Sequence, residues 1–267
     1  MSNPKSKYKI IFKEIKAYLL SVITEVGSAV FFLYEVMERI FTGRVRFKEL
    51  ITQIYEQGSQ SVGIIILISL STGMVLALQG YVILNRFGAK EYVAQLVALS
   101  LIRELSPILS SIVFSGKAGA RISAELGTMS VNDQILATRT LGVDPIEFLA
   151  VSRILACIIV LPLLIVISEL VGVLGGFIMG VFSAKITASY YLRRSIEAIA
   201  FVDFFSGLIK TVCFSVIIGW VCCYQGFATK GGSLGVGRYT TKAVAYCYIF
   251  IILSNFVLTK IILSIWG

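Results

Sequence analysis

The sequence predicts an all-α integral membrane protein whose residues 1–267 form a single membrane domain. The first observation is composition: 57% of the 267 residues are hydrophobic and the mean hydropathy is +0.88, which exceeds the apolar share of soluble domains. The second is a set of long uncharged runs, such as 57–85 and 211–229. About 20 apolar residues in a helix cross the hydrocarbon core, where a helix satisfies its own backbone hydrogen bonds.

Residues 8–40 are expected to form an N-terminal amphipathic helix at the membrane interface. Ile11, Ile15 and Leu19 recur at four-residue steps, and the lysines lie mostly off this stripe. Such lysines favour the anionic lipid of a cytoplasmic leaflet. A soluble helix packed on the rest of the chain is the alternative. The scattered lysines, with no compact apolar core or cleavage site, argue against a cleavable signal peptide.

Five transmembrane helices are predicted to follow, near residues 62–85, 92–116, 152–182, 204–228 and 242–265. If the basic N-terminus is cytoplasmic, the basic segments 117–151 and 229–241 are cytoplasmic too, as the positive-inside bias requires. The net charge of +9 then belongs to the flanks of the spans, which argues against a nucleic-acid-binding surface. The outer segment 185–203 departs from the bias, and we expect its basic residues on a short surface helix.

Residues 118–150 form a polar, charged block between two apolar spans. Ser130 to Asp133 match a capping box, which predicts a helix over 131–141 that ends at Gly142. Asp144 and Pro145 predict a second helix start. A solvated connector is the alternative, but the density of start and stop signals favours a surface on which a cytosolic protein docks.

The chain lacks the residues of an ATP-hydrolysing motor. It has no G-x-x-x-x-G-K-[ST] sequence, and the fragment SGKA at 115–118 lacks both the upstream glycine and the hydroxyl residue. We therefore expect ATP and magnesium to be bound by a separate ATPase, with no cofactor or metal in this chain. Histidine is absent, which removes the commonest metal ligand. Five cysteines are expected to be small buried hydrophobes, since their spacing fits no zinc site: Cys157, Cys213, Cys222, Cys223 and Cys247.

Two adjacent charges, Arg103 and Glu104, interrupt the predicted span 92–116. A charge at the bilayer centre costs about 2.5–3.5 kcal/mol on insertion scales, so such residues indicate function by default. Adjacent helical residues point about 100° apart, so these two do not simply neutralise each other. The structural alternative is an interhelical ion pair between Arg103 and Glu169. Pro107 is expected to loosen the helix locally.

Several strings of the chain resemble the MlaE/YrbE family, the permease subunits of bacterial ABC transporters that work with MCE proteins. The matching strings are GMVLALQGY (73–81), ALSLIRELSPILSSIVFSGKAGARISAELGTM (98–129), LGVDP (141–145), SRILACIIVLPLL (152–164) and GRYTTKAV (237–244). The likeness extends over residues 45–260, with the motifs in the family's order and spacing. One departure is Asp133-Gln134-Ile135, where the family usually has Glu-Gln-Ile.

The resemblance implies a homodimer in the bacterial inner membrane, with a cytoplasmic N-terminus, cytoplasmic ABC ATPase subunits and a periplasmic MCE hexamer. It implies transport of phospholipid between the inner membrane and the MCE carrier, which maintains outer-membrane lipid asymmetry. The lipid-binding residues that it implies, around a cavity at the dimer centre, are Leu76, Gln79, Ile83, Leu84, Phe87, Arg103, Glu104 and Leu105. The ATPase-coupling residues that it implies are Glu125, Gly127, Asp133, Gln134 and Arg139.

Three other functions stay open at this point. The permease could carry another hydrophobic cargo, such as a sterol. An intramembrane lipid-modifying enzyme would use Glu104 as its acid or base, but it needs a second catalytic group nearby. A proton-driven secondary transporter would be expected to contain inverted repeats, and five spans do not divide into two such halves.

Overall fold

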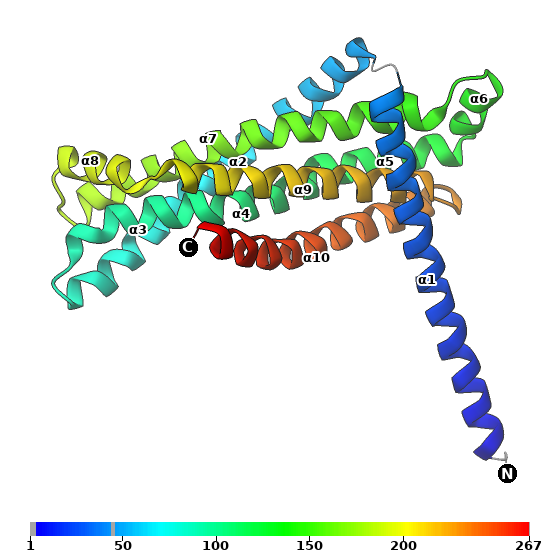
Figure 1. Cartoon of the computed structure of the whole chain (residues 1–267), viewed down its shortest axis with the longest axis horizontal. Coiled ribbons are helices and arrows are strands. Elements are labelled where there is room, and N and C mark those ends of the chain that lie inside the picture. Colours follow the sequence, from blue (N-terminus) through cyan, green and yellow to red (C-terminus); the bar gives the residue numbers. More distant parts are fainter. Residues whose placement is uncertain (1–3, 44–45, 267) are drawn as a thin grey trace.

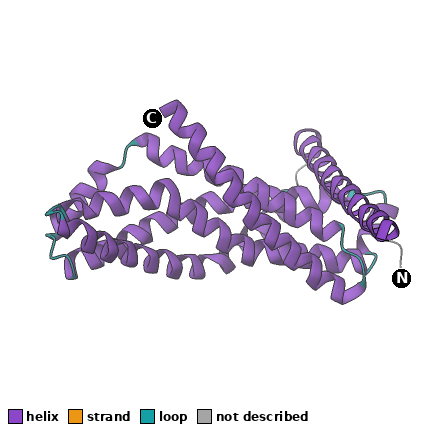
Figure 2. Ribbon diagram, turned by 90° about the horizontal axis from the view of Figure 1, so that it is seen from below, coloured by secondary structure: helices purple, strands orange, loops and turns teal. Residues whose placement is uncertain are grey.

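The structure, a computed structural model, describes residues 4–43 and 46–266, and within these ranges it describes the side chains from residue 23 onward. Every element in this described part is a helix, and short loops join the helices (Figure 2). Five helices are long and apolar enough to cross a membrane: Phe47–Arg86, Lys90–Val131, Ile146–Phe182, Phe201–Phe227 and Gly232–Trp266. The predicted all-α class and the five spans are confirmed.

The long helices are divided into the following elements, labelled as in Figure 1: α1 (Pro4–Thr42), α2 (Phe47–Arg86), η1 (Lys90–Tyr92), α3 (Val93–Ser100), η2 (Leu101–Leu105), α4 (Ser106–Phe114), η3 (Ser115–Gly119), α5 (Ala120–Val131), α6 (Gln134–Thr140), η4 (Ile146–Val151), α7 (Ser152–Phe182), α8 (Ala188–Ala198), α9 (Phe201–Phe227) and α10 (Gly232–Trp266). Of the four short η elements, η1 is a 3₁₀ turn. The other three are π-helical turns inside longer helices.

Three spans extend furthest beyond their predicted bounds. The first helix begins at Phe47, the second runs on to Val131, and the fifth begins at Gly232. The segment 229–241, predicted as a loop, is therefore mostly helical. Hydropathy detects only the part of a helix that lies in hydrocarbon, whereas the backbone hydrogen bonds continue through the polar turns beyond it.

The spans form an elongated bundle in which α2 lies along α7 (Figure 1). Glycines allow this close contact. A Cβ at Gly73 would overlap the carbonyl oxygen of Gly172, and a Cβ at Gly175 would overlap that of Leu70. Helices in a membrane gain stability from such backbone proximity, because lipid provides no hydrophobic force between them.

One end of the bundle, which we call the α8 end, carries α8 and the turn between α2 and α3 (Figure 1). Tyr191 of α8 is buried against Gly176 and Gly180 of α7. Its ring meets that of Phe177 edge-on, with centroids 5.7 Å apart. The predicted short helix in segment 185–203 is confirmed, and the exposed Arg193 lies on it.

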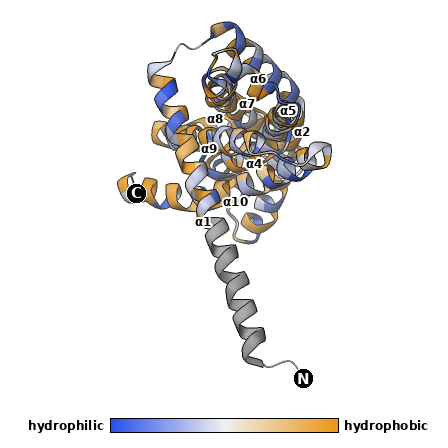
Figure 3. Ribbon diagram, turned by 90° about the vertical axis from the view of Figure 1, so that its right-hand side faces the viewer, coloured by the Kyte–Doolittle hydropathy of each residue, from blue (hydrophilic) through white to orange (hydrophobic). Residues whose placement is uncertain are grey.

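The opposite end, which we call the α6 end, carries α6 and α1 (Figure 1). Hydrophilic segments gather there around α6 and the C-terminal part of α1 (Figure 3). The predicted helix over 8–40 is confirmed as α1, which crosses the bundle steeply, as a helix lying along a membrane surface would (Figure 1). The side chains of Ile11, Ile15 and Leu19 lie outside the described side chains, so the amphipathic stripe stays a prediction.

Candidate functional site

The local helix geometry separates the two charges of the second span. Pro107 has no backbone N–H, and just before it the helix widens into the π-helical turn η2. The Ser106 N–H bonds to the Leu101 carbonyl, five residues back. The predicted loosening at Pro107 is confirmed, and Arg103 and Glu104 of this turn reach different partners.

Arg103 pairs with Asp203 at the start of α9. Its guanidinium Nε lies 2.6 Å from Asp203 Oδ1. The Asp203 side chain is 6% exposed and also accepts the Ala200 N–H at 3.1 Å, so it caps α9 as well. Half of the Arg103 side chain, 49%, remains exposed. The guanidinium therefore keeps N–H groups free to bind an anion.

The predicted interhelical ion pair of Arg103 is confirmed, but its partner is Asp203 and not Glu169. Glu169 is buried on α7, and a Cβ at Gly207 of α9 would lie 3.5 Å from its Oε1. Hydropathy gives the depth of a charge in the membrane but not the direction in which its side chain points. The sequence pattern therefore does not indicate Asp203 as the partner, because this residue lies at the very edge of an apolar run.

Glu104 is held by three donors from two other helices. Lys210 Nζ of α9 lies 2.6 Å from Glu104 Oε1. From α10, Asn255 Nδ2 donates to Oε2 at 3.1 Å and Thr259 Oγ1 donates to Oε1 at 3.0 Å. The Lys210 ammonium also donates to the Arg103 carbonyl at 2.9 Å. We call these six side chains the polar network: Arg103, Glu104, Asp203, Lys210, Asn255 and Thr259.

The polar network is electrically balanced, because the carboxylates of Glu104 and Asp203 offset the cations of Arg103 and Lys210. All of its side chains except that of Asn255 line a pocket of about 130 Å³ whose other walls are mostly apolar, among them Leu263 of α10. The balanced charge explains how four ionisable groups are tolerated inside spans. The pocket suits a ligand with an anionic group and an apolar body.

The implied lipid-binding residues are not all gathered in this pocket. Only Arg103 and Glu104 line it. The partly buried Leu76, Leu84 and Leu105 pack against the small core between α2, α3 and α8. The remaining three are exposed, Gln79 and Ile83 on α2 and Phe87 directly after it. A lipid-binding role stays a prediction for all eight.

In the polar block 118–150, at the α6 end, the first predicted helix start differs from the structure. Ser130 lies in the last turn of α5, where its hydroxyl bonds to the Thr229 carbonyl at 3.2 Å. Asp133 then adopts a positive φ of 57°, and α6 begins only at Gln134. The predicted capping box is therefore wrong, because the Ser130 hydroxyl serves a tertiary contact. The predicted helix end is confirmed, with Gly142 at a φ of 78°.

Asp144 joins this block to α1. One carboxylate oxygen accepts the Ile146 N–H at 2.9 Å, so the predicted second helix start is confirmed. The other oxygen accepts Arg39 Nε of α1 at 2.9 Å. Burial raises the pKa of Asp144, but the hydrogen bonds from Arg39 and Ile146 outweigh it and hold the pKa below the ordinary value.

The implied coupling residues fall into two groups. Asp133, Gln134 and Arg139 are exposed on residues 132–142, the segment of α6 and its flanking turns, which we call the tip. Glu125 lies deeper, 2.6 Å from Arg121 and 3.3 Å from Arg153. Gly127 is buried, and a Cβ there would lie 2.9 Å from Thr229 Oγ1. A role in ATPase coupling stays a prediction for all five, and Glu125 and Gly127 also hold the base of the tip together.

Comparison with known proteins identifies the family of this chain. The family described as Permease MlaE matches residues 50–261. The chain belongs to the MlaE permease family. It is 36% identical over 240 residues to a probable ABC transporter permease protein of Rickettsia conorii, covering 90% of this chain and 93% of the relative. It is 34% identical over 219 residues to the intermembrane phospholipid transport system permease protein MlaE of Haemophilus influenzae, covering 82% and 84%.

A plant relative is also similar. The chloroplastic protein TRIGALACTOSYLDIACYLGLYCEROL 1 of Arabidopsis thaliana is 33% identical over 226 residues, which cover 85% of this chain and 65% of the plant protein. The MlaE family match begins within α2 and ends within α10. It therefore contains both the polar network and the tip, whereas α1 lies outside it. Membership makes this chain a multi-pass permease of a transport system.

Proposed function

We propose that the chain is the non-catalytic membrane subunit of an ABC transporter that moves phospholipid between the bacterial inner membrane and a periplasmic MCE carrier, and so maintains outer-membrane lipid asymmetry. The observation that carries this proposal is the pocket at the polar network. There a half-exposed Arg103 lies beside apolar side chains of α10. A guanidinium binds phosphate oxygens in a bidentate manner, and the apolar wall accepts an acyl chain.

The proposed orientation puts the α6 end in the cytoplasm. Basic residues at this end include Arg139, Lys230 and Arg238, and the positive-inside bias favours them on that side. The tip exposes Leu136 and Leu141 beside its polar side chains. Exposed apolar groups rimmed by polar ones are typical of protein interaction sites, and the partner that we propose is an ABC ATPase, which binds ATP and magnesium.

The proposed homodimer rests on the open sides of the bundle. In the most apolar window of α10, 6% of the residues are buried, against 28–50% in the other four spans. The exposed Gln79 and Ile83 of α2 and Phe87 directly after it would complete a central lipid cavity if a second copy faced them. The MCE hexamer would then lie on the α8 end of the dimer.

The polar network also bears on the alternative functions. A sterol has no phosphate for Arg103 to bind, so an anionic headgroup fits the pocket better. An enzyme would need Glu104 free to exchange a proton with its substrate, whereas three donors hold this carboxylate. These contacts favour phospholipid transport over a sterol cargo and over an intramembrane enzyme.

Affinity purification of the tagged chain from native membranes in mild detergent tests the proposal, with mass spectrometry of proteins and lipids. We expect a P-loop ATPase, an MCE protein and bound phospholipid to copurify. Recovery of the chain without an ATPase at any salt concentration would contradict the coupling role. Bound sterol in place of phospholipid would contradict the cargo, and lipid turnover by the chain alone would support the enzyme.

A further inference from the structure

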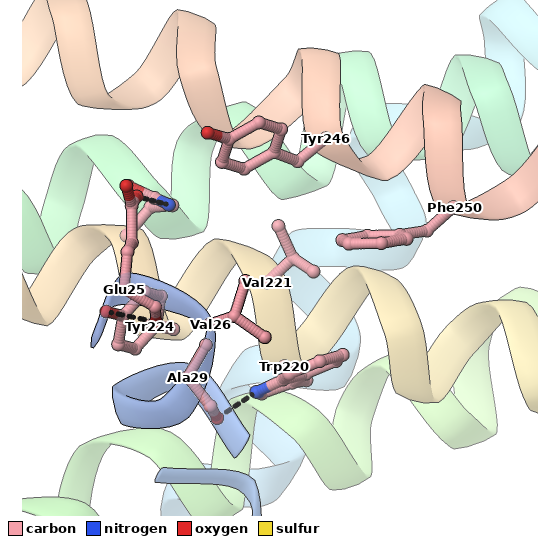
Figure 4. A pocket seen from close by; sticks show the side chains of 9 residues that line it. Glu25, Val26, Ala29, Trp220, Val221, Tyr224, Tyr246 and Phe250 are labelled. Carbon is pink, nitrogen blue, oxygen red and sulfur yellow. Dashed lines mark hydrogen bonds between the residues drawn. The ribbon is translucent and has the colours of Figure 1, made fainter. Parts of the chain in front are cut away.

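A groove lies at the α6 end, where α1 crosses α9 and α10 (Figure 4). Its first pocket has a volume of about 240 Å³ and a mostly apolar lining. The lining comes from Val26 and Ala29 of α1, from Trp220 and Val221 of α9, and from Phe250 of α10. This pocket shares no residue with the one at the polar network, so the two are separate.

The groove is held open by specific contacts. The Trp220 indole N–H donates to the Ala29 carbonyl at 2.8 Å, which fixes α1 across α9 (Figure 4). On its other side the Trp220 ring stacks near Phe250, with centroids 6.2 Å apart and planes at 22°. Ala29 contributes only a methyl group, so the space between these two rings and α1 is not filled. Val26 is 57% exposed and Phe250 is 39% exposed, so the apolar lining is accessible from outside.

The groove changes from apolar to cationic along its length. A second pocket shares Glu25 and Tyr224 with the first, and it shares Lys230 and Lys242 with a third. The third pocket, of about 710 Å³, adds Arg238. The shared residues make the three pockets neighbours in one continuous groove.

The acidic side chains of the groove leave its cationic end unbalanced. Lys242 Nζ binds Glu25 Oε1 at 2.5 Å, so these two charges offset each other. Glu35 lines only the middle pocket. Within the described side chains, neither Lys230 nor Arg238 forms a salt bridge. Lys230 and Arg238 therefore line the cationic end of the groove without a carboxylate partner.

We propose that this groove binds an anionic phospholipid of the leaflet at the α6 end, with its phosphate at Lys230 and Arg238 and an acyl chain along Trp220 and Phe250. Charge-assisted hydrogen bonds from lysine and arginine are strong for phosphate, and hydrocarbon is favoured against the apolar lining. A free phosphate ion would use only the cationic end. The apolar half of the groove therefore identifies a lipid as the occupant.

This site is additional to the transport pocket and has a different position. It would anchor α1, which the family match leaves out, to lipid of one leaflet. The inference uses the orientation proposed above to name that leaflet as cytoplasmic, but it does not depend on transport. Binding in this groove is therefore testable without ATP, an ATPase or an MCE protein.

Photocrosslinking in nanodiscs tests the proposal. The full chain is reconstituted in phosphatidylcholine with a minor fraction of phosphatidylglycerol that carries a photoreactive acyl group, and labelled peptides are identified by mass spectrometry. We expect labelling near Trp220 and Phe250. The same photoreactive chain on phosphatidylcholine should label these peptides several-fold less, because its headgroup has no net negative charge.

Paired variants separate the two ends of the groove. Ala29→Phe fills the apolar pocket and should abolish labelling, whereas Val30→Phe, on the next and exposed position of α1, should not. Lys230→Gln and Arg238→Gln should each weaken labelling by phosphatidylglycerol about fivefold, the effect of one basic residue near an anionic surface. Arg193→Gln at the α8 end is the charge-matched control and should have no effect.

Several outcomes would overturn the proposal. Equal labelling by both lipids in every variant would show an unspecific contact with bulk lipid. Crosslinks from these positions to a second copy of the chain or to an ATPase would show that protein covers the groove. Binding of inorganic phosphate without any labelling by lipid would identify a site for a free anion. If transport failed but labelling behaved as expected, only the function proposed above would be wrong.

Discussion

The ammonium group of Lys210 lies 2.6 Å from the carboxylate of Glu104, and the lysine side chain is only 2% exposed. The same ammonium binds the carbonyl oxygen of Arg103, so one cation of α9 binds two consecutive residues of the π-helical turn in the second span. A buried ion pair contributes little net stability, but removing one partner leaves the other charge uncompensated. The pair therefore ties α9 to the second span and makes their relative position sensitive to charge.

We expect Lys210→Met to destabilise the protein by about 1–3 kcal/mol, because it leaves the Glu104 carboxylate, which is 36% exposed, without its cation. Denaturant or thermal unfolding in detergent micelles measures the change. Lys260→Met, which removes an exposed lysine of α10, is the control and should be nearly neutral. Adding Glu104→Gln to Lys210→Met should recover part of the loss. If the double variant instead loses the sum of the two single effects, the pair is not coupled.

Gly73→Ala should destabilise the bundle by about 1–3 kcal/mol or more, since its new methyl group would overlap the Gly172 carbonyl oxygen of α7. Backbone cannot rotate away as a side chain can, so α2 and α7 must separate. Gly63→Ala lies on the same helix with open space around it and should be neutral or stabilising by up to about 1 kcal/mol through helix propensity. Unfolding midpoints of the two variants measure whether their changes in stability differ in this way. A loss of stability in both would contradict the packing explanation.

Sequence patterns predicted the spans well because a membrane imposes one strong requirement. Runs such as 57–85 have to be helical in lipid, whatever packs against them. The ends of the helices were harder to predict, since polar turns like those from Gly232 onward carry no hydropathy signal. The capping pattern at Ser130 was misleading because a serine hydroxyl serves a helix start and a contact with another segment equally well.

The candidate site was only half visible in the sequence. Arg103 and Glu104 stand out in an apolar run, and so they were identified. Lys210 lies just before the uncharged run that begins at Thr211, and the neutral Asn255 and Thr259 have no charge to draw attention to them. These partners come from helices distant in the sequence, and only the packing of the bundle brings their side chains together.

We expect acid to release α1 from the α6 end. Because hydrogen bonds hold the folded pKa of Asp144 below its ordinary value, its contacts with Arg39 and Ile146 stabilise the fold at every pH above that ordinary value, about 4. The contribution is lost as the pH falls through the lowered folded pKa. Hydrogen exchange of residues 141–149 between about pH 3 and 6, corrected for the intrinsic pH dependence, measures it. Asp144→Asn should weaken this protection at neutral pH and leave it independent of pH in this window. Glu197→Gln, which changes a pair at the α8 end, should leave it unchanged.

The exposed tip makes a sharper prediction about the proposed ATPase. Arg139 lies on α6 and Leu136 is 57% exposed beside it, whereas neither side chain lines the core of the bundle. Arg139→Glu and Leu136→Ser should therefore leave the unfolding midpoint within about 0.5 kcal/mol of the original stability and yet reduce copurification of the ATPase strongly. Arg193→Glu, an equivalent charge reversal on α8, should preserve copurification.

By contrast, Glu125→Gln removes a partner of both Arg121 and Arg153. It should therefore lower stability together with any loss of ATPase association. If instead Arg139→Glu retains the ATPase while Glu125→Gln loses it without unfolding, the coupling surface lies at the base of the tip rather than on α6.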